Sequence, residues 1–571
     1  MLWIEEQFCH SKVESLSQNL GLSNLVVKLL LSRGISSKEE AITFLNPKLA
    51  QLSDPLCIPN LEKASSRICK AILGNEHILI VGDYDVDGIS STVIVQKTLT
   101  SLGGSSKYVI PHRKTEGYGL SMEVIRRGMQ KGNFSLIIAL DCGTNSFKEA
   151  EFLAKHSVDL VVVDHHKAKE KIHPSAIIIN PHLDLKPEKI WRDMCTAGLC
   201  FKLAHGIIKL LREQGNELSF GISPRDYLAL TALGTLADMV PLTGENRILA
   251  KYGLKHLRKN PDLGLNKLIK IAKFNTAFPF QSEDVTFRIA PRINACGRLD
   301  SPETAAELLL SENSNEASEL VSKMDDFNEQ RKKIETRLTE KAIEQAEAKF
   351  SLEKGIVVLG KGSEWNPGVV GIVAGKLSNR FNKPCLVLGY DGGNYKGSGR
   401  SNEDINLVDA LSFCKDYLVH WGGHPAAVGL TVNEFEVDYF IEKFLSFLDG
   451  HTHENTEKKV KIDTIVNSSE ICEELLHEVE KLGPFGQENP EPIFALKEII
   501  LKTKPKRIGN GDHFQFRIED ENSSIQGIAW NMSERIPPSL EKIDLAFKLR
   551  WNRWQNRNSL QVVLQDWKIS N

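Results

Sequence analysis

The sequence predicts an α/β protein with a parallel-sheet domain, a long linking helix, a second α/β domain and a C-terminal β-barrel. Two patterns predict it: short apolar runs rich in Ile and Val alternate with helical segments, and a series of short strand-like runs follows residue 460. Runs that are apolar on both faces and alternate with helices are typical of a parallel sheet covered on both sides. We expect a helical segment at 1–40, the first domain at 41–325, the linking helix at 326–350, the second domain at 351–450 and the barrel at 460–571.

The expected strands are short. In the first domain they are residues 78–81, 136–140, 160–163 and 177–179, and in the second 356–359 and 385–388. Residues 326–350 contain neither Gly nor Pro and have only a thin apolar stripe, which favours a helix that bridges domains. A surface helix of the first domain is the alternative. Several short strands with turn signals after residue 460 indicate a small barrel.

Composition excludes several classes of protein. The 571 residues carry a net charge of −3, so any nucleic-acid site must be a local basic patch. The ten cysteines include no Cys-x-x-Cys pair, which argues against a disulfide framework or structural zinc and favours a reducing cytoplasm. The apolar runs are too short to span a bilayer, and the first residues do not resemble a signal peptide.

Acidic and imidazole side chains follow three of the expected strands. Asp83, Asp85 and Asp87 follow the first, Asp141 the second, and the segment 164–166 (Asp-His-His) the third. The carboxyl ends of parallel strands meet at one edge, where ligands bind, and carboxylates gathered there repel each other unless a cation neutralises them. A lone Asp at such a place is usually a helix cap, but three sets in one sheet predict a metal site. An EF-hand is excluded because Glu is missing from the twelfth position.

The ligand types suit Mn²⁺ or Mg²⁺ better than cysteine-bound zinc. So many carboxylates imply two divalent cations, which at about 3.5–4 Å separation can activate a water molecule and stabilise a leaving oxygen. The residues therefore indicate a metal-dependent phosphoesterase.

The motifs GDYDVDG, DCG and DHH, in this order, resemble the DHH phosphoesterase superfamily, and LGTLADMVPLTGENR resembles its fourth motif. The resemblance implies that two metals are held by Asp85, Asp87, Asp141, His165 and Asp238, and that His166 helps to hold the scissile phosphate. Many relatives have a histidine where Val81 stands here, and Asp83 is the obvious substitute ligand. If His165 must be neutral to bind metal, activity should fall below about pH 6.

Further segments resemble the RecJ exonucleases within that superfamily. They run from the first domain to the barrel: IPHRKTEGYGL, FRIAPRINACGRLDSPETAAELLL, FNEQRKKIE, GVVGIVAGKLSNRFNKP, KGSGRS, GGHPAAVGL and LGPFGQENPEPIF. The resemblance implies a DHH catalytic domain, a DHHA1 domain and an oligonucleotide-binding (OB) barrel.

The expected substrate-binding residues lie in these segments. The backbone amides, hydroxyls and guanidinium of GSGRS suit an oxyanion, although the segment could be an ordinary turn. The resemblance implies that Arg298, Ser398 and Arg400 bind the 5′-phosphate, that Arg113 contacts the backbone and that the loop of His424 faces the catalytic site. Tyr118, between two glycines, either stacks on a base or is buried.

Basic and aromatic residues alternate in the barrel at 502–507 and 550–557, which fits single-strand binding. Trp551 and Trp554 could instead belong to the barrel core.

The resemblance implies a single-stranded-DNA-specific 5′-to-3′ exonuclease that releases 5′-mononucleotides in DNA repair and recombination. It also implies a cytoplasmic monomer that acts with a helicase and a single-strand-binding protein. Two other functions stay open: a phosphodiesterase for short oligonucleotides or cyclic dinucleotides, and a non-catalytic repair scaffold.

Overall fold

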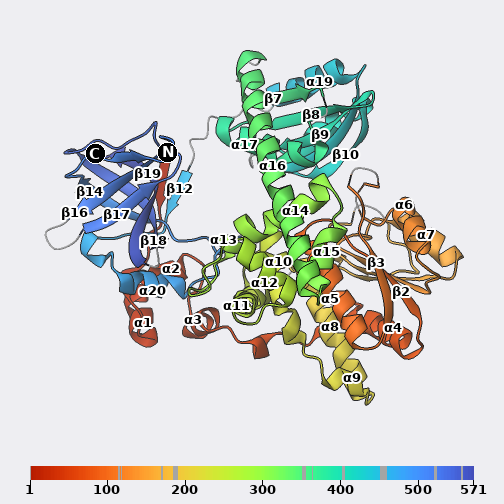
Figure 1. The fold of residues 1–571 in the computed structure, drawn as a ribbon. Helices are drawn as coiled ribbons and strands as arrows, with labels where there is room; N and C mark the ends of the chain where they lie inside the picture. The colour runs from red at the N-terminus through yellow and green to blue at the C-terminus, as the bar shows by residue number, and fades with distance from the viewer. Residues whose placement is uncertain are drawn as a thin grey trace. The chain divides into compact units, whose positions relative to one another are not determined.

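The computed structural model describes residues 2–113, 116–117, 119–168, 171–183, 191–349, 355–362, 364–401, 405–450, 459–519, 524–554 and 557–570. Figure 1 traces the chain. It forms two compact units, one of Ser53–Asp238 and Tyr252–Glu454, the other of Met1–Leu52, Met239–Lys251 and Asn455–Asn571. Among the described helices, none has the length and apolar character needed to cross a membrane.

A five-stranded parallel sheet lies at the centre of the first α/β domain. Its order is β3 (Ser105–Val109), β2 (His77–Val81), β4 (Leu136–Leu140), β5 (Asp159–Val163) and β6 (Ile177–Ile179). All four expected runs are strands of this sheet. The edge strand β3 was missed because its sequence SSKYV alternates exposed and buried residues and has no continuous apolar run.

Helices cover both faces of this sheet. α6 (Met122–Met129) and α7 (Phe147–Lys155) pack on one face, and α4 (Leu61–Leu73), α5 (Val86–Ser101) and α8 (Thr196–Glu213) pack on the other. The domain continues with α9 (Glu217–Phe220), α10 (Leu228–Ala237), α11 (Gly244–Lys259), α12 (Leu263–Ile271), α13 (Ser282–Asp284), a π-helical turn (Val285–Ile289), α14 (Ala290–Leu299) and α15 (Glu303–Leu310).

The long helix α16 (Ser314–Lys349) joins the two α/β domains of this unit and begins before the expected residue 326. It packs against α12, α14 and α15, and then against α17 and β7 (Figure 1). Leu338, Ala342 and Ala346 are fully buried in the core of the second domain. The thin apolar stripe of the sequence is therefore a packing surface and not a solvent-facing bridge.

The second domain contains a mixed five-stranded sheet. Its order is β10 (Leu418–His424), β11 (Ala427–Asn433), β9 (Asn394–Arg400), β8 (Cys385–Asp391) and β7 (Ile356–Gly360). Only β7 and β8 pair in parallel. α17 (Pro367–Phe381) packs on one face, and α18 (Leu407–Phe413) and α19 (Val437–Asp449) pack on the other.

The other unit is built around a seven-stranded sheet. Its order is β13 (Thr464–Ile465), β14 (Phe494–Ile500), β18 (Lys542–Trp554), β19 (Arg557–Ile569), β17 (Ser524–Ala529), β16 (His513–Glu519) and β15 (Lys506–Ile508). Its helix is α20 (Glu473–Glu480). Trp551 packs against the core of this sheet, as the alternative interpretation expected, whereas the side chain of Trp554 lies outside the described residues.

The N-terminal residues belong to the same unit as the seven-stranded sheet. β1 (Leu2–Glu5) pairs in parallel with β12 (Lys459–Ile462), and Trp3 Nε1 donates a hydrogen bond to Asp566 at 2.9 Å. α1 (His10–Leu20), α2 (Asn24–Leu31) and α3 (Lys38–Leu45) follow, and α2 and α3 contribute buried residues to the same core as the sheet. The domain limits drawn from the sequence stay predictions, since these compact units divide the chain differently.

Residues 239–251 contact both the N-terminal and the C-terminal segments of this unit. Arg247 is 2% exposed and lies 3.7 Å from the ring of Phe44. It donates to the carbonyl oxygens of Phe44 and Lys481, at the ends of α3 and α20, and Lys251 donates to Leu45. The negative ends of two helix dipoles therefore compensate the buried Arg247 and the half-buried Lys251.

We predict that Leu29→Ala in α2 destabilises the unit that contains the C-terminal sheet. Leu29 is fully buried in that core, so its truncation should lower the free energy of unfolding by about 2–5 kcal/mol. The control Ile42→Ala removes a side chain that is 48% exposed in α3 and should cost less than about 0.5 kcal/mol. Denaturant unfolding followed by tryptophan fluorescence measures both, and equal effects would contradict the packing.

Candidate metal centre

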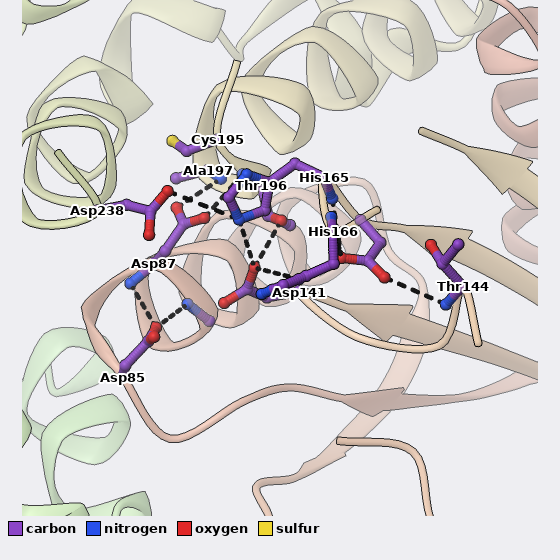
Figure 2. A network of polar contacts seen from close by, with 12 residues as sticks. Asp85, Asp87, Asp141, Thr144, His165, His166, Cys195, Thr196, Ala197 and Asp238 are labelled. Atoms are coloured by element: carbon purple, nitrogen blue, oxygen red, sulfur yellow. Dashed lines mark hydrogen bonds and ion pairs between the residues drawn. The ribbon is translucent and has the colours of Figure 1, made fainter. Parts of the chain in front are cut away.

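The loops that follow β2, β4 and β5 converge at one edge of the parallel sheet. Three groups of side chains there have ligand atoms within 4.8 Å of one another: Asp83, Asp85 and Asp141; Asp87, His165 and Asp238; and Asp141, His165 and His166. Every metal and catalytic residue expected from the sequence is in one of these groups. Figure 2 shows most of them.

The loop after β2 turns directly into α5. Asp85 is the N-cap of α5, and its Oδ1 accepts hydrogen bonds from the backbone N–H groups of Asp87 and Gly88, both at 3.0 Å. A Cβ at Gly88 would lie 2.7 Å from Asp83, so only glycine permits this close turn. The alternating aspartates are thus fixed by the start of the helix.

The amino end of α8 holds Asp87. Its two oxygens accept hydrogen bonds from the backbone N–H groups of Thr196 at 2.7 Å and Ala197 at 2.9 Å (Figure 2). A Cβ at Gly234 in α10 would lie 2.4 Å from Asp87 Oδ1, so glycine is needed here as well. A buried carboxylate at a helix amino end is stabilised by the helix dipole.

Asp141 has a left-handed backbone conformation with φ of 63°, which is uncommon outside glycine. Its N–H continues the ladder to Val163 at 2.9 Å, and its Oδ1 accepts a hydrogen bond from the Thr196 hydroxyl at 2.8 Å. Residues held in strained conformations of this kind are concentrated at functional sites.

Asp164 orients the two histidines and was missed as a site residue. Its Oδ1 accepts hydrogen bonds from the backbone N–H of His165 and from His166 Nδ1, both at 2.8 Å. Burial alone would raise the pKa of Asp164, but its hydrogen bonds, chiefly that of His166, bring the pKa to about 2. The pKa of His166 is raised despite its burial, because of the same hydrogen bond.

His165 lies between two carboxylates. Its Nε2 is 3.5 Å from Asp141 Oδ1 and 3.6 Å from Asp238 Oδ2. Asp238 ends α10, far from the other ligands in sequence. Burial, and then the charge of His166, lower the pKa of His165 to about 4, so its imidazole is neutral at physiological pH and suited to bind metal.

The carboxylates of the cluster raise one another's pKa. Burial and the charges of neighbouring aspartates raise the pKa of Asp87 to about 6 and that of Asp238 to about 9. The pKa values of Asp83 and Asp141 are also well above the usual range, for the same two reasons. A divalent cation would remove this repulsion, so the donor set fits hard cations.

Asp83 supplies a separate observation in favour of a cation. It is completely buried, and neither of its carboxylate oxygens has a hydrogen-bond partner within the described part of the chain. Unpaired buried carboxylates are costly unless a cation neutralises them. Asp83 thus lies where a ligand is needed, while Val81 is buried within β2.

The expected substrate-binding arginines gather beside this cluster. The Arg113 guanidinium lies 5.2 Å from the centre of the Tyr84 ring, between Asp83 and Asp85 in sequence. Burial, followed by the charge of Arg113, lowers the pKa of Arg298 to about 10, and the same causes lower that of Arg400. A Cβ at Gly371 would lie 3.1 Å from Ser398 Oγ and 3.3 Å from Arg400 Nη2.

His424, in the second α/β domain, faces the cluster of candidate metal ligands in the first α/β domain. Its ring is stacked on that of His166, with centroids 6.4 Å apart. Tyr118 lies outside the described residues. The remaining expected substrate residues, from three elements and one loop, therefore lie around the same centre.

Comparisons with known proteins agree with this arrangement. The family models "DHH family, N-terminal domain", "DHHA1 domain" and "RecJ OB domain" match residues 77–235, 353–450 and 462–566. The chain is 35% identical to the single-stranded-DNA-specific exonuclease RecJ of Bacillus subtilis, over all of this chain and 71% of that protein. The chain belongs to the RecJ family.

Solved structures of a RecJ protein are similar over the whole chain. RecJ from Thermus thermophilus in complex with Mn²⁺ matches with a TM-score of 0.85 and 26% identity, over all of this chain and 80% of that one. Its complex with Mg²⁺ matches with a TM-score of 0.79 and 25% identity, over all of this chain and 79% of that one. The predicted α/β fold with DHH, DHHA1 and OB domains is confirmed.

Two sets of residues that hold the candidate ligands in place are not predicted by the sequence. Asp164 belongs to the DHH motif but is not among the site residues predicted from the sequence, and Thr196 and Ala197 lie at the start of a helix. The segment Cys-Thr-Ala-Gly before an apolar helix was the available signal, because small residues there leave backbone N–H groups accessible.

The pKa values also change the expected pH dependence. Since His165 stays neutral down to about pH 4, protons compete with metal mainly at the carboxylates. The pKa of Asp238 in the folded, ion-free protein, about 9, is far above its value in the unfolded chain, so its contribution to stability is lost as pH rises toward 9.

We predict that the ion-free protein melts at a lower temperature at about pH 8.5 than at about pH 7, and that Mg²⁺ stabilises it more at the higher pH. Asp238→Asn removes the titrating carboxylate and should reduce both differences. Differential scanning calorimetry with EDTA or excess Mg²⁺ measures this. If the variant showed the same pH dependence as the wild type, repulsion among the clustered carboxylates would not be its cause.

Proposed function

We propose that the protein is a single-stranded-DNA-specific exonuclease that degrades DNA from the 5′ end and releases 5′-mononucleotides. The convergence of Asp83, Asp85, Asp87, Asp141, His165 and Asp238 at one sheet edge is the observation that carries the reaction type. Membership of the RecJ family supports the substrate. The match to a RecJ OB domain favours this function over hydrolysis of very short oligonucleotides or cyclic dinucleotides.

The proposed ligands for two divalent cations, Mn²⁺ or Mg²⁺, are these six residues. When bound, such a pair would lower the pKa of a water molecule, hold the scissile phosphate and neutralise charge on the departing oxygen. The chain contributes rigid placement, because Asp87 and Asp141 are both held by hydrogen bonds from Thr196.

His166 would hold and donate a proton. Asp164 keeps its Nδ1 hydrogen-bonded and raises its pKa, which favours the protonated imidazolium, the form in which Nε2 also carries a proton. From Nε2, that proton could hydrogen-bond to a phosphate oxygen as negative charge develops. His424 would approach the same phosphate from the DHHA1 domain. This arrangement would stabilise the transition state more than the ground state.

Direction would be set by the arginines. Arg298, Ser398 and Arg400 would bind the 5′-terminal phosphate and Arg113 would contact the backbone nearby, which leaves the next phosphodiester at the metal centre. Water attacks that phosphorus and the bond to the 3′-oxygen of the terminal nucleotide breaks. The remaining strand then carries a new 5′-phosphate, so each cleavage would regenerate the group that the arginines recognise.

The biological setting belongs to the proposal as well. A role in DNA repair and recombination follows from the family, and a cytoplasmic monomer that acts with a helicase and a single-strand-binding protein is consistent with it. All ten cysteines are unpaired, which suits a reducing compartment.

We predict that Asp141→Ala lowers kcat at least about a thousandfold, because several kcal/mol of transition-state stabilisation are lost, while DNA binding persists. The assay is Mn²⁺-dependent degradation of single strands labelled at either end. A 5′ label should leave first, as a mononucleotide. Asp159→Ala, at the exposed opposite end of β5, is the control. Early release of a 3′ label, or cleavage of dinucleotides alone, would contradict the function.

We predict that Arg400→Ala reduces the preference for a 5′-phosphate over a 5′-hydroxyl by at least about tenfold, because a half-buried charged donor is lost. kcat should fall less than this ratio. Lys396→Ala on the same strand is the control, since Lys396 pairs with Asp391. Comparison of kcat/KM on the two strands measures the effect, and an unchanged preference would count against the 5′-phosphate site.

A further inference from the structure

The linking helix α16 brings a fourth guanidinium to the arginines of the DHH and DHHA1 domains. Arg331 has a side chain that is 11% exposed, and its charge contributes, after burial and Arg113, to the lowered pKa of Arg298. Arg298 in turn donates a hydrogen bond to the carbonyl oxygen of Gly368, in the first turn of α17. Because α14, α16 and α17 pack against one another, and Glu335 links Arg331 to Lys376 of α17, Arg331 lies close to the place where these three helices meet.

The contacts of Arg331 leave donor groups unused. Its Nη1 donates to Glu335 at 2.5 Å and its Nη2 to Asn328 Oδ1 at 2.9 Å. Its Nε and the Nδ2 of Asn328 are buried, and neither has a hydrogen-bond partner in the part of the chain that the structure describes. Buried donors without partners are uncommon, because they cost free energy.

The charge balance of this region is strongly positive. Among the described residues, no carboxylate is within ion-pair distance of Arg298 or Arg400. Glu335 pairs with Arg331, but it is shared with Lys376 of α17, at 2.7 Å. Like charges that are buried together are unfavourable unless an anion compensates them.

We propose that Arg331 and Glu335 act as positioning residues that set how strongly the neighbouring arginines select a terminal phosphate monoester. This rests on the proposed function. The Nε of Arg331 is enclosed, so Arg331 acts through its charge and its placement beside Arg298 rather than by touching the phosphate. Glu335 partly cancels that charge and holds Arg331 in place.

The ligand chemistry follows from the excess of positive charge. A terminal phosphate monoester carries up to two negative charges, whereas an internal phosphodiester carries one and a 5′-hydroxyl none. Among the described residues, Arg298, Arg331 and Arg400 have only the carboxylate of Glu335 in an ion pair, and Lys376 shares it, so this excess of positive charge favours the monoester most. The linking helix thereby contributes to recognition of the strand end as well as joining the two domains.

The proposal makes opposite predictions for the two partners of one ion pair. Arg331→Gln should lower the ratio of kcat/KM for 5′-phosphate over 5′-hydroxyl strands by about tenfold, since one buried cation is lost. Glu335→Gln should raise the same ratio several-fold, because Arg331 and Lys376 lose their shared counter-charge. Arg331→Lys should restore part of the ratio, as it keeps the charge but loses the planar fork.

A residue with a purely structural role would not move this ratio in opposite directions. Lys332→Gln is the matched control, because Lys332 lies on the same helix, is 51% exposed and pairs with Glu329. Its ratio should equal that of the wild type. Kinetics with the full-length protein, Mn²⁺ and one oligonucleotide, prepared with a 5′-phosphate or a 5′-hydroxyl, give this ratio for the wild type and the four variants.

The outcomes separate this proposal from the proposed function. If no variant or wild-type protein hydrolyses DNA, the function itself is wrong. If hydrolysis depends on the 5′-phosphate but Glu335→Gln lowers the ratio, or Arg331→Gln leaves it unchanged, only the role of α16 is overturned. Should Arg331→Gln fail to fold, inhibition by 5′-dTMP still tests Glu335→Gln, which should bind that product several-fold more tightly.

Discussion

The mutual repulsion of buried carboxylates is the constraint on which the rest of the structure depends. Asp83, Asp87 and Asp141 are almost completely buried, and burial together with the charges of Asp87 and Asp83 raises the pKa of Asp141. Such a set is costly in an ion-free protein, and the cost is offset when cations bind. Relief of this repulsion therefore contributes to the free energy of metal binding. Other interactions hold the ligands of the site in place.

Those other interactions come from backbone groups and hydrogen bonds supplied by neighbouring elements. The amino end of α8 holds Asp87 and Asp141, while Asp164 fixes the histidines. A preorganised set of ligands needs little rearrangement during the reaction, which is the main source of electrostatic catalysis. The arginines on α14, α16 and β9 are the positive counterpart of the carboxylate cluster. Their excess of positive charge would favour a bound anion. In the proposed function, these two oppositely charged centres would together hold one terminal nucleotide.

The sequence was sufficient for the fold and for bringing most candidate ligands together, because both depend largely on local patterns. Apolar runs give the strands, and the carboxyl ends of parallel strands must meet, so Asp85, Asp141 and His165 could be placed together without coordinates. Asp238 required the family resemblance, since α10 approaches the sheet edge only in three dimensions. The contribution of Thr196 and the proposed contribution of Arg331 could not be predicted from the sequence, because each depends on how the helices pack against one another. The packing of residues 1–52 with the C-terminal sheet could not be predicted from the sequence either, because no local pattern indicates that β1 pairs with β12.

The most direct test of the metal centre is anomalous scattering at the manganese edge from crystals grown with Mn²⁺. The arrangement of Asp83, Asp85, Asp87, Asp141, His165 and Asp238 predicts two peaks within this cluster, separated by about 3.5–4 Å. Asp83 should contact one of them. A single peak outside the cluster, or none at saturating Mn²⁺, would contradict the account.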